Sequence, residues 1–192
     1  MIIGSHNSWS YLPSKKWYLT PFKFIAKCQD LNIYEQYVHG VKCFDLRIRW
    51  NKKGVPEIAH GFMVYKITLS EILEHLDFLN NKKDCYVRVI LEVRTKKQYT
   101  DFQIDKFNNF CKFCVKHYDN IKFWCGRNLY NWNEDFKFDI EPTCAEKYSS
   151  VCSPRIIDDW YPRLFARINN KKIIRQGTSN DILLIDFVNY GC

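Results

Sequence analysis

The chain has 192 residues and a formal net charge of +8 at pH 7, and 46% of its residues are hydrophobic and 17% aromatic. This length and composition predict one globular domain, residues 1–192, and no apolar run approaches the roughly 18 residues that a membrane-spanning helix needs. The charge is compatible with nucleic acid, an anionic membrane or a phosphate-bearing substrate, but no basic block or nucleic-acid motif is present, so we expect no nucleic-acid partner.

The N-terminal region begins with a short apolar stretch that ends in the polar run S-H-N-S, which places His6 at the end of a first strand. The segment Trp9 to Lys27 is a long connection in which aromatic residues alternate with lysines. It either packs as an ordinary strand-to-helix connection or forms a rim that docks on a membrane, because aromatic side chains favour the headgroup level and lysines are attracted to anionic lipid. A helix is predicted from Gln29 to His39, where Gly40 ends it.

Residues 40–61 read as two strands joined by a polar turn. In the first strand the apolar residues alternate with Asp45 and Arg47, so the acid and the base share one face. Charged side chains are costly inside a core unless they are paired. Taken alone, the hairpin is therefore best interpreted as having a solvated face, and His60 closes its second strand.

The order of these polar residues along the chain suggests a site for a phosphodiester. His6 and His60 both stand at strand ends, with Asp45 and Arg47 on the strand between them. Two imidazoles can divide general-base and general-acid work, and a guanidinium can hold phosphoryl oxygens.

After the hairpin, strands and helices are expected to alternate as far as residue 125. Thr68 to Glu71 form a capping box that begins a helix, and Thr100 caps a second helix with an apolar stripe. A buried strand, Cys85 to Thr95, lies between the two helices, and a short strand follows at Ile121 to Cys125.

Beyond residue 125 the pattern is weaker. Residues 126–151 read mostly as loop, with a candidate strand at Phe136 to Ile140. Pro154 suits the first position of a helix that runs to about Ile168 with a kink at Pro162. Two more strands are predicted, a weak one at Lys172 to Arg175 and a stronger last one at Asp181 to Asn189.

The nine cysteines are odd in number and irregularly spaced. The one C-x-x-C pair, Cys111 and Cys114, falls inside a helical pattern and lacks a second pair at zinc-binding spacing. We therefore expect buried thiols rather than disulfides or metal ligands. A predicted strand begins at Met1 without a basic and apolar leader, which favours an intracellular protein, or a secreted one whose leader is missing.

Four motifs, S-H-N-S-W, G-V-K-C-F-D-L-R, A-H-G-F and V-I-L-E-V-R, occur in this order within residues 4–95. Together they resemble the X-region of phosphatidylinositol-specific phospholipase C. The late D-I-L-L-I-D-F-V-N also resembles the last strand of the bacterial enzymes. The resemblance covers about half of the chain and fades between residues 100 and 180.

Alternating strands and helices imply parallel β–α units and an α/β fold. The resemblance implies a distorted, reduced (β/α) TIM-like barrel with its site at the C-terminal ends of the strands. A barrel of this length must lack some helices, especially around residues 126–151.

The resemblance also implies a reaction. His6 would take the proton from the inositol 2-hydroxyl that attacks phosphorus, and His60 would protonate the departing diacylglycerol oxygen. The products would be diacylglycerol and a cyclic inositol phosphate, released from phosphatidylinositol or a glycosyl-phosphatidylinositol. Asp186 resembles the carboxylate that orients the base histidine.

Arg47 and Arg94 stand where the calcium-dependent eukaryotic enzymes place acidic ligands. Asn7 and Asp45 alone are too few for calcium, which takes six to eight oxygens. The resemblance therefore favours the metal-free bacterial branch, with no cofactor and with a guanidinium supplying the positive charge. In that branch Asp45 would hold Arg47 or assist His60.

The expected substrate contacts are less well defined. Asn7 stands where the bacterial pattern has aspartate, and Arg94 is a candidate phosphate contact. Glu146 and Tyr148 resemble an inositol-contacting acid and a stacking tyrosine, although they fit equally well as loop residues placed there by chance. The headgroup-binding arginine of the bacterial enzymes has no assigned counterpart, so headgroup preference stays open.

Two other interpretations remain. A metal-dependent phosphodiesterase of the glycerophosphodiesterase or phospholipase D toxin type needs an acidic cluster near the first histidine, where this chain has Ser8-Trp9-Ser10. A non-catalytic lipid-binding module is supported by the shortened barrel but not by the intact histidine pair. The favoured interpretation predicts a monomer that contacts a phosphatidylinositol-containing membrane peripherally.

Overall fold

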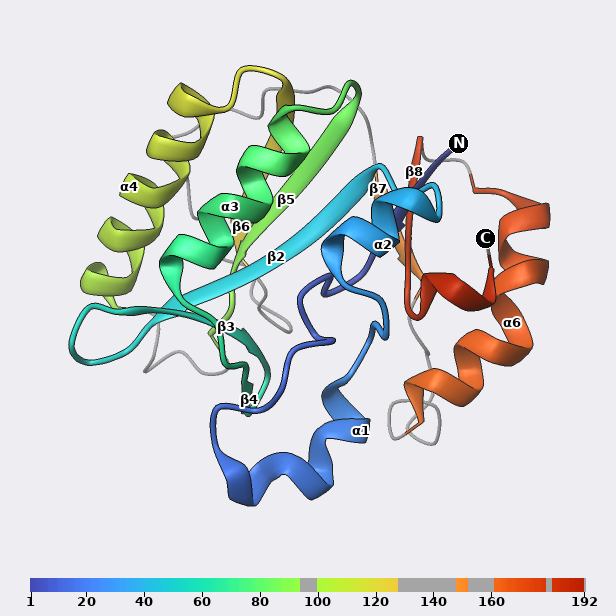
Figure 1. Ribbon diagram of the computed structural model, residues 1–192, viewed down its shortest axis with the longest axis horizontal. Coiled ribbons are helices and arrows are strands. Elements are labelled where there is room, and N and C mark those ends of the chain that lie inside the picture. Colours follow the sequence, from blue (N-terminus) through green and yellow to red (C-terminus); the bar gives the residue numbers. More distant parts are fainter. Residues whose placement is uncertain (94–99, 128–147, 152–160, 179–180, 192) are drawn as a thin grey trace.

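The computed structural model describes residues 1–93, 100–127, 148–151, 161–178 and 181–191 (Figure 1). These residues form an eight-stranded mixed sheet. Its strands are β1 (Ile2–Ser5), β2 (Cys43–Trp50), β3 (Pro56–His60), β4 (Met63–Val64), β5 (Cys85–Leu91), β6 (Ile121–Arg127), β7 (Tyr148–Val151) and β8 (Ile182–Ile185).

Six of the strands are parallel and lie in the order β6-β5-β2-β1-β8-β7, which follows the chain around the sheet. The hairpin β3–β4 adds to the last residues of β2 in antiparallel pairing, with Ile48 opposite Ile58. This order is that of a singly wound (β/α) barrel. Within the described part of the chain no pairing joins β6 to β7, so the sheet is open there and closure of the predicted barrel stays a prediction.

Helices cover the outer face of the sheet, which faces away from Asp45 and Arg47. Figure 1 shows α3 and α4 side by side over β2 and β5, while α6 lies beyond β8 at the other end of the sheet. The helical elements are η1 (Trp17–Phe22), α1 (Lys23–Ala26), α2 (Ile33–Val38), α3 (Leu69–Asn80), α4 (Asp101–His117), α6 (Pro162–Gln176) and η3 (Val188–Tyr190). None of the helices in the described ranges is both long and apolar enough to cross a membrane.

The helix starts agree with the capping signals in the sequence. Thr68 and Glu71 form both hydrogen bonds of a capping box, as predicted. The Thr100 side chain accepts a hydrogen bond from the Gln103 backbone N–H at the start of α4, also as predicted. Asn32 forms a further capping box, and α2 starts at Ile33, four residues later than the expected helix start at Gln29.

The two faces of β2 differ in chemistry. Phe44, Leu46 and Ile48 pack into the main core beneath the helices. The inner face, opposite to them, carries Cys43, which packs in a small apolar cluster with residues of β5, β6 and β8. Asp45 and Arg47 follow Cys43 on this inner face. The prediction that Asp45 and Arg47 share one face is confirmed. The interpretation of that face as solvated is wrong, because Asp45 is 0% and Arg47 5% exposed.

The first strand lies very close to both of its neighbours. A Cβ atom at Gly4 would lie 2.4 Å from Leu184 Cδ2 and 2.9 Å from Cys43 Cβ, so only glycine fits there. The register sets Ser5, the last residue of β1, beside Phe44 of β2 and beside Ile185, the last residue of β8. The polar residues that follow β1 and β8 therefore lie next to Asp45 and Arg47 of β2.

Several predicted elements differ from the structure. The stretch Lys172 to Arg175 is not a strand but the last turn of α6, which begins at Pro162 with proline in the first turn. The connection Trp9 to Lys27 contains η1 and α1, and Trp9 is buried in the core. The last strand ends at Ile185 and is followed by η3. The candidate strand 136–140 and the predicted helix start at 154 lie outside the described residues.

Candidate active site

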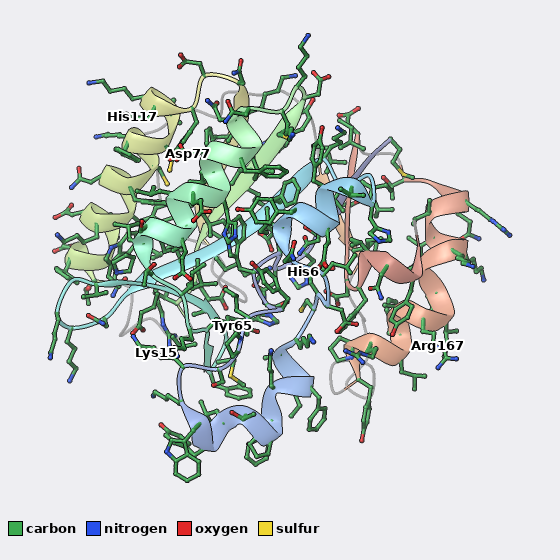
Figure 2. The ribbon with its side chains drawn as sticks, in the orientation of Figure 1. His6, Lys15, Tyr65, Asp77, His117 and Arg167 are labelled. Atoms are coloured by element: carbon green, nitrogen blue, oxygen red, sulfur yellow. The ribbon has the colours of Figure 1, made fainter. Side chains whose placement is uncertain are left out.

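The five side chains predicted to be catalytic meet where β1, β3 and β8 end beside β2. His6 follows β1, and Asp186 follows β8. Asp45 and Arg47 project from β2, and His60 is the last residue of β3. Figure 2 shows His6 near the centre of the molecule, between the sheet and the segment that leads to α2.

The turn after β1 is fastened to β2 by hydrogen bonds that run in both directions. The Ser8 backbone N–H donates to the Asp45 carbonyl over 3.0 Å, and the Asp45 backbone N–H donates to Ser8 Oγ over 2.7 Å. Asn7 has a φ of 47°, a left-handed conformation that asparagine tolerates better than most residues. Its backbone N–H then points to Asp45 Oδ2 at 2.9 Å. The S-H-N-S motif thus fixes where His6 lies.

His6 is held from both sides of its ring. Its Nδ1 lies 2.7 Å from Asp186 Oδ1, and its Nε2 lies 2.7 Å from Arg47 Nη2. A guanidinium has only donors, so Nε2 must accept and cannot carry a proton. The proton of the neutral ring is therefore on Nδ1, where it donates to Asp186. His6 is fixed in the tautomer that leaves Nε2 able to accept a proton.

Arg47 forms ion pairs with two carboxylates and also contacts His6. Its Nε donates to Asp45 Oδ2 over 2.8 Å, and its Nη1 donates to Glu92 Oε2 over 3.3 Å. Burial alone would lower the pKa of Arg47, but Asp45 and Glu92 outweigh that effect and raise it. The guanidinium is thus a permanent positive charge in fixed orientation beside His6.

Asp45 is a buried carboxylate that stays ionised. Burial by itself would raise its pKa, but the guanidinium groups of Arg47 and Arg88 outweigh burial and hold the pKa well below its usual range. Arg88 Nη1 lies 3.5 Å from Asp45 Oδ1, and Arg47 contacts Oδ2. Both carboxylate oxygens therefore face guanidinium groups.

His60 lies next to His6, and the two rings meet edge to face with centroids 5.7 Å apart. Its Nδ1–H donates to the Ala26 carbonyl over 3.0 Å, and the Tyr65 hydroxyl donates to the same carbonyl over 2.7 Å. Burial has the largest effect on the pKa of His60, and the positive charge of Arg47 has the next largest; together they lower this pKa to about 4. The ring is therefore neutral at pH 7, with the proton on Nδ1 and the lone pair on Nε2.

Two residues that support the site were not predicted from the sequence. Buried Glu92 accepts from Arg47 and, through Oε1, from the Gly61 backbone N–H at 2.9 Å, so it ties the arginine to the residue after His60. Gln29 donates to the carbonyls of His6 and Ile185 over 3.0 and 2.9 Å, which joins the ends of β1 and β8. The motif V-I-L-E-V-R contained a signal for Glu92, since an acid interrupts a buried strand.

The remaining predicted contacts are not all described. Arg94 and Glu146 lie outside the described residues. Tyr148 opens β7, but the position of its side chain is likewise outside the described part. Among the described side chains one group could ligate a metal ion, formed by His6, Cys28 and Asp186.

The sequence is similar to known proteins over its first half. The family model for the X domain of phosphatidylinositol-specific phospholipase C matches residues 3–114. A 1-phosphatidylinositol phosphodiesterase of Listeria monocytogenes is 28% identical over 113 residues, which cover 58% of this chain and 34% of that protein. The matched part thus spans about a third of the length of that curated relative.

The fold is similar to solved structures of the same kind. A variant of the phosphatidylinositol-specific phospholipase C from Staphylococcus aureus has a TM-score of 0.69 at 13% identity, covering 100% of this chain and 86% of that chain. The enzyme from Listeria monocytogenes has a TM-score of 0.65 at 16% identity, covering 97% and 87%. At these identities the likeness concerns the fold alone.

Proposed function

Because this chain belongs to the phosphatidylinositol-specific phospholipase C X-domain family, we propose that it cleaves phosphatidylinositol, or a glycosyl-phosphatidylinositol, to diacylglycerol and a cyclic inositol phosphate. The observation that carries the proposal is the arrangement of Asp186, His6 and Arg47, in which a carboxylate orients a base and a guanidinium lies at the base's reactive nitrogen. General acid–base catalysis needs an oriented base, and electrostatic stabilisation of the phosphoryl oxygens needs a positive charge beside it.

In the proposed reaction His6 is the general base. Its Nε2 accepts the proton of the inositol 2-hydroxyl as that oxygen attacks phosphorus, and Asp186 stabilises the imidazolium that results. Arg47 Nη2 occupies the position in front of Nε2 in the free protein. A bound phosphodiester offers this guanidinium two anionic oxygens as acceptors in place of the imidazole lone pair, and Nε2 is then left for the hydroxyl.

His60 is the proposed general acid. Because it is neutral in the free protein, it must gain a proton when the substrate binds. With a pKa of about 4 it carries no extra proton at pH 7. The phosphodiester is an anion placed beside His60 and Arg47, so its charge opposes the two effects that lower the pKa, burial and Arg47. Substrate binding is therefore coupled to protonation of His60 Nε2, which then donates to the diacylglycerol oxygen.

The proposal includes catalysis without a metal ion. In the calcium-dependent relatives a cation faces the charge that develops on the phosphoryl oxygens, whereas Arg47 supplies a positive charge here. Asp45 supports this role because both of its oxygens are directed to Arg47 and Arg88. A guanidinium held by two carboxylates keeps its position as charge develops.

The test of the proposal is product analysis with phosphatidylinositol vesicles, with and without chelator, for the parent and for His6→Ala and His60→Ala. We expect diacylglycerol and a cyclic inositol phosphate, the same rate in chelator, and a loss of about 10²–10⁴-fold or more in each variant. Activity lost in chelator and restored by a divalent cation would favour a metal-dependent phosphodiesterase instead. Vesicle binding without turnover would favour the lipid-binding module.

Peripheral membrane contact is part of the proposal. The η1–α1 segment exposes Trp17, Tyr18, Phe22 and Phe24. Next to it, a pocket of about 530 Å³ lies between α1 and α6, and apolar walls and four cationic side chains line it, namely Lys23, Lys27, Arg163 and Arg167. Aromatic and cationic side chains together suit an anionic lipid surface. One structural neighbour was studied for the membrane binding of the Staphylococcus aureus enzyme.

A further inference from the structure

Cys28 is a buried thiol next to catalytic groups, yet the proposed reaction does not use it. Its side chain is 1% exposed, and Sγ lies 3.8 Å from His60 Nδ1. One ligand atom each of His6, Cys28 and Asp186 lie within 4.8 Å of one another. A thiol, an imidazole and a carboxylate thus converge on one point, and they come from three separate segments of the chain.

The backbone holds the thiol at this point. The Cys28 backbone N–H donates to Ser10 Oγ over 2.9 Å, and its carbonyl accepts from the Phe187 backbone N–H over 2.6 Å. Phe187 directly follows Asp186, so Cys28 is tied to the chain segment that carries the carboxylate. The thiol and the carboxylate are therefore positioned relative to each other before any ligand binds, which is what a metal site requires.

The three donors match the ligand preferences of Zn²⁺. Zinc binds thiolate, imidazole and carboxylate at about 2.0–2.3 Å in tetrahedral geometry, so its ligand atoms lie roughly 3.3–3.8 Å apart. Atoms that are already within 4.8 Å reach this spacing with small side-chain movements. A sulfur ligand selects zinc over calcium and magnesium, which take oxygen.

The charged side chains around the three donors carry a net negative charge. Among the described side chains that meet here, Asp45, Glu92 and Asp186 are carboxylates, and Arg47 and Arg88 are the guanidinium groups that pair with Asp45. The positive charges of Arg47 and Arg88 are balanced by the negative charges of Asp45 and Glu92. That leaves Asp186, together with the thiolate that forms on metal binding, to balance zinc.

We propose that His6, Cys28 and Asp186 form a Zn²⁺ site inside the catalytic centre, and that Zn²⁺ inhibits the protein by binding there. A bound ion would replace the thiol proton and take the lone pair of His6 Nδ1, whose proton would move to Nε2. Nε2 would then carry a proton and could not act as the base, and Asp186 would bind the ion instead of orienting the imidazole. The inhibitory effect rests on the proposed function, whereas the binding of zinc does not.

Zinc binding is tested without any activity measurement. Thermal unfolding of the full chain, in a non-thiol reductant, is followed with increasing Zn²⁺ for the parent, Cys28→Ala, Cys28→Ser and Cys85→Ala. Cys85 is a buried thiol at the start of β5 and is the matched control. We expect Zn²⁺ to raise the Tm of the parent and of Cys85→Ala. Zinc affinity should fall at least about 10-fold in both Cys28 variants.

Binding of Co²⁺ gives a second readout, because a cysteine ligand produces a sulfur-to-cobalt absorption band that other ligands do not. The band is expected in the parent and in Cys85→Ala and absent in Cys28→Ser. If the zinc-induced rise in Tm is unchanged in both Cys28 variants, or if no such band forms in the parent, the proposed site is wrong.

Inhibition is measured separately on phosphatidylinositol vesicles. Micromolar Zn²⁺ should stop turnover by the parent, chelator should restore it, and Cys28→Ala should keep the parent's rate without zinc and resist inhibition. Zinc binding without inhibition would overturn the inhibitory role alone. A protein that binds zinc through Cys28 but shows no turnover under any condition would contradict the proposed function and leave the metal site standing.

Discussion

Arg47 contacts three side chains that each have a different part in the site. It donates to the lone pair of His6, to Asp45 and to Glu92. Because it donates to His6, it fixes the tautomer of the proposed base. Because two carboxylates hold it, its charge stays in place when a phosphodiester binds. A point charge on a flexible side chain would meet neither requirement.

Arg47→Lys should therefore lose most of the activity although it keeps the positive charge. An ammonium cannot donate in parallel to two phosphoryl oxygens, and we expect the rate to fall by about 10²-fold or more. The measurement is kcat on phosphatidylinositol, with thermal unfolding as the control for folding. If Arg47→Lys keeps full activity, charge alone is sufficient and the fixed geometry of the guanidinium has no role.

The depressed pKa of His60 predicts a pH dependence of stability. The unfolded chain binds the His60 proton with the ordinary pKa of 6.5, and the folded protein binds it at about 4. Between these values the unfolded state holds more protons, so the free energy of unfolding falls as the pH is lowered from 6.5 toward 4. Urea unfolding at several pH values should show a smaller decrease in His60→Gln than in the parent.

A matched variant isolates this effect, because other groups also titrate in the acid range. His75, for example, has a pKa that burial lowers. His39→Gln replaces an exposed histidine at the end of α2 and is the matched control. An equal pH dependence in the parent and in His60→Gln would contradict the assignment of a neutral His60.

At the scale of elements, the sequence predicted what local patterns determine. The capping residues Thr68 and Thr100 start α3 and α4, and the alternation along β2 separates the core face from the charged face. His6 and His60 stood at predicted strand ends, and Asp45, Arg47 and Asp186 stood on predicted strands. The five side chains converge in the structure. Local pattern was sufficient to name these residues, and the register of β1 against β2 and β8 brings them together.

The features that could not be predicted from the sequence depend on contacts between distant segments of the chain. The burial of Asp45 was missed because its guanidinium partners include Arg88, which β5 brings alongside β2. Lys172 to Arg175 looked like a strand because Ile173 and Ile174 are β-branched, yet they continue a helix that packs beside η3. Cys28 lies in a stretch with no periodic signal, and only the fold places its thiol near His6 and Asp186.

At the scale of the whole molecule, the exposed aromatic side chains and the cationic pocket lie on one side. Figure 1 shows η1 and α1 projecting below the sheet, at the side where β2 ends. The segment that begins there also carries Cys28 and the Ala26 carbonyl that holds His60. A surface that contacts this segment would therefore lie next to the candidate catalytic groups. This arrangement favours the rim interpretation of the segment, except for Trp9, which is part of the core.

Replacing Trp17 and Lys16 together by alanine should therefore weaken binding to anionic vesicles while leaving hydrolysis of a soluble substrate unchanged. Trp17 is 84% exposed and packs only against Tyr18 among the ring contacts described, so little folding energy is lost. Losing a lysine near anionic lipid and a tryptophan at the headgroup level should reduce the affinity for vesicles by about 10-fold or more.

Phe102→Ala, which removes an exposed aromatic side chain on α4 away from this segment, is the control and should bind vesicles as the parent does. Vesicle sedimentation and the soluble assay are compared for all three proteins, and an equal loss in both assays would mean that residues 9–27 are a structural connection and not a membrane contact.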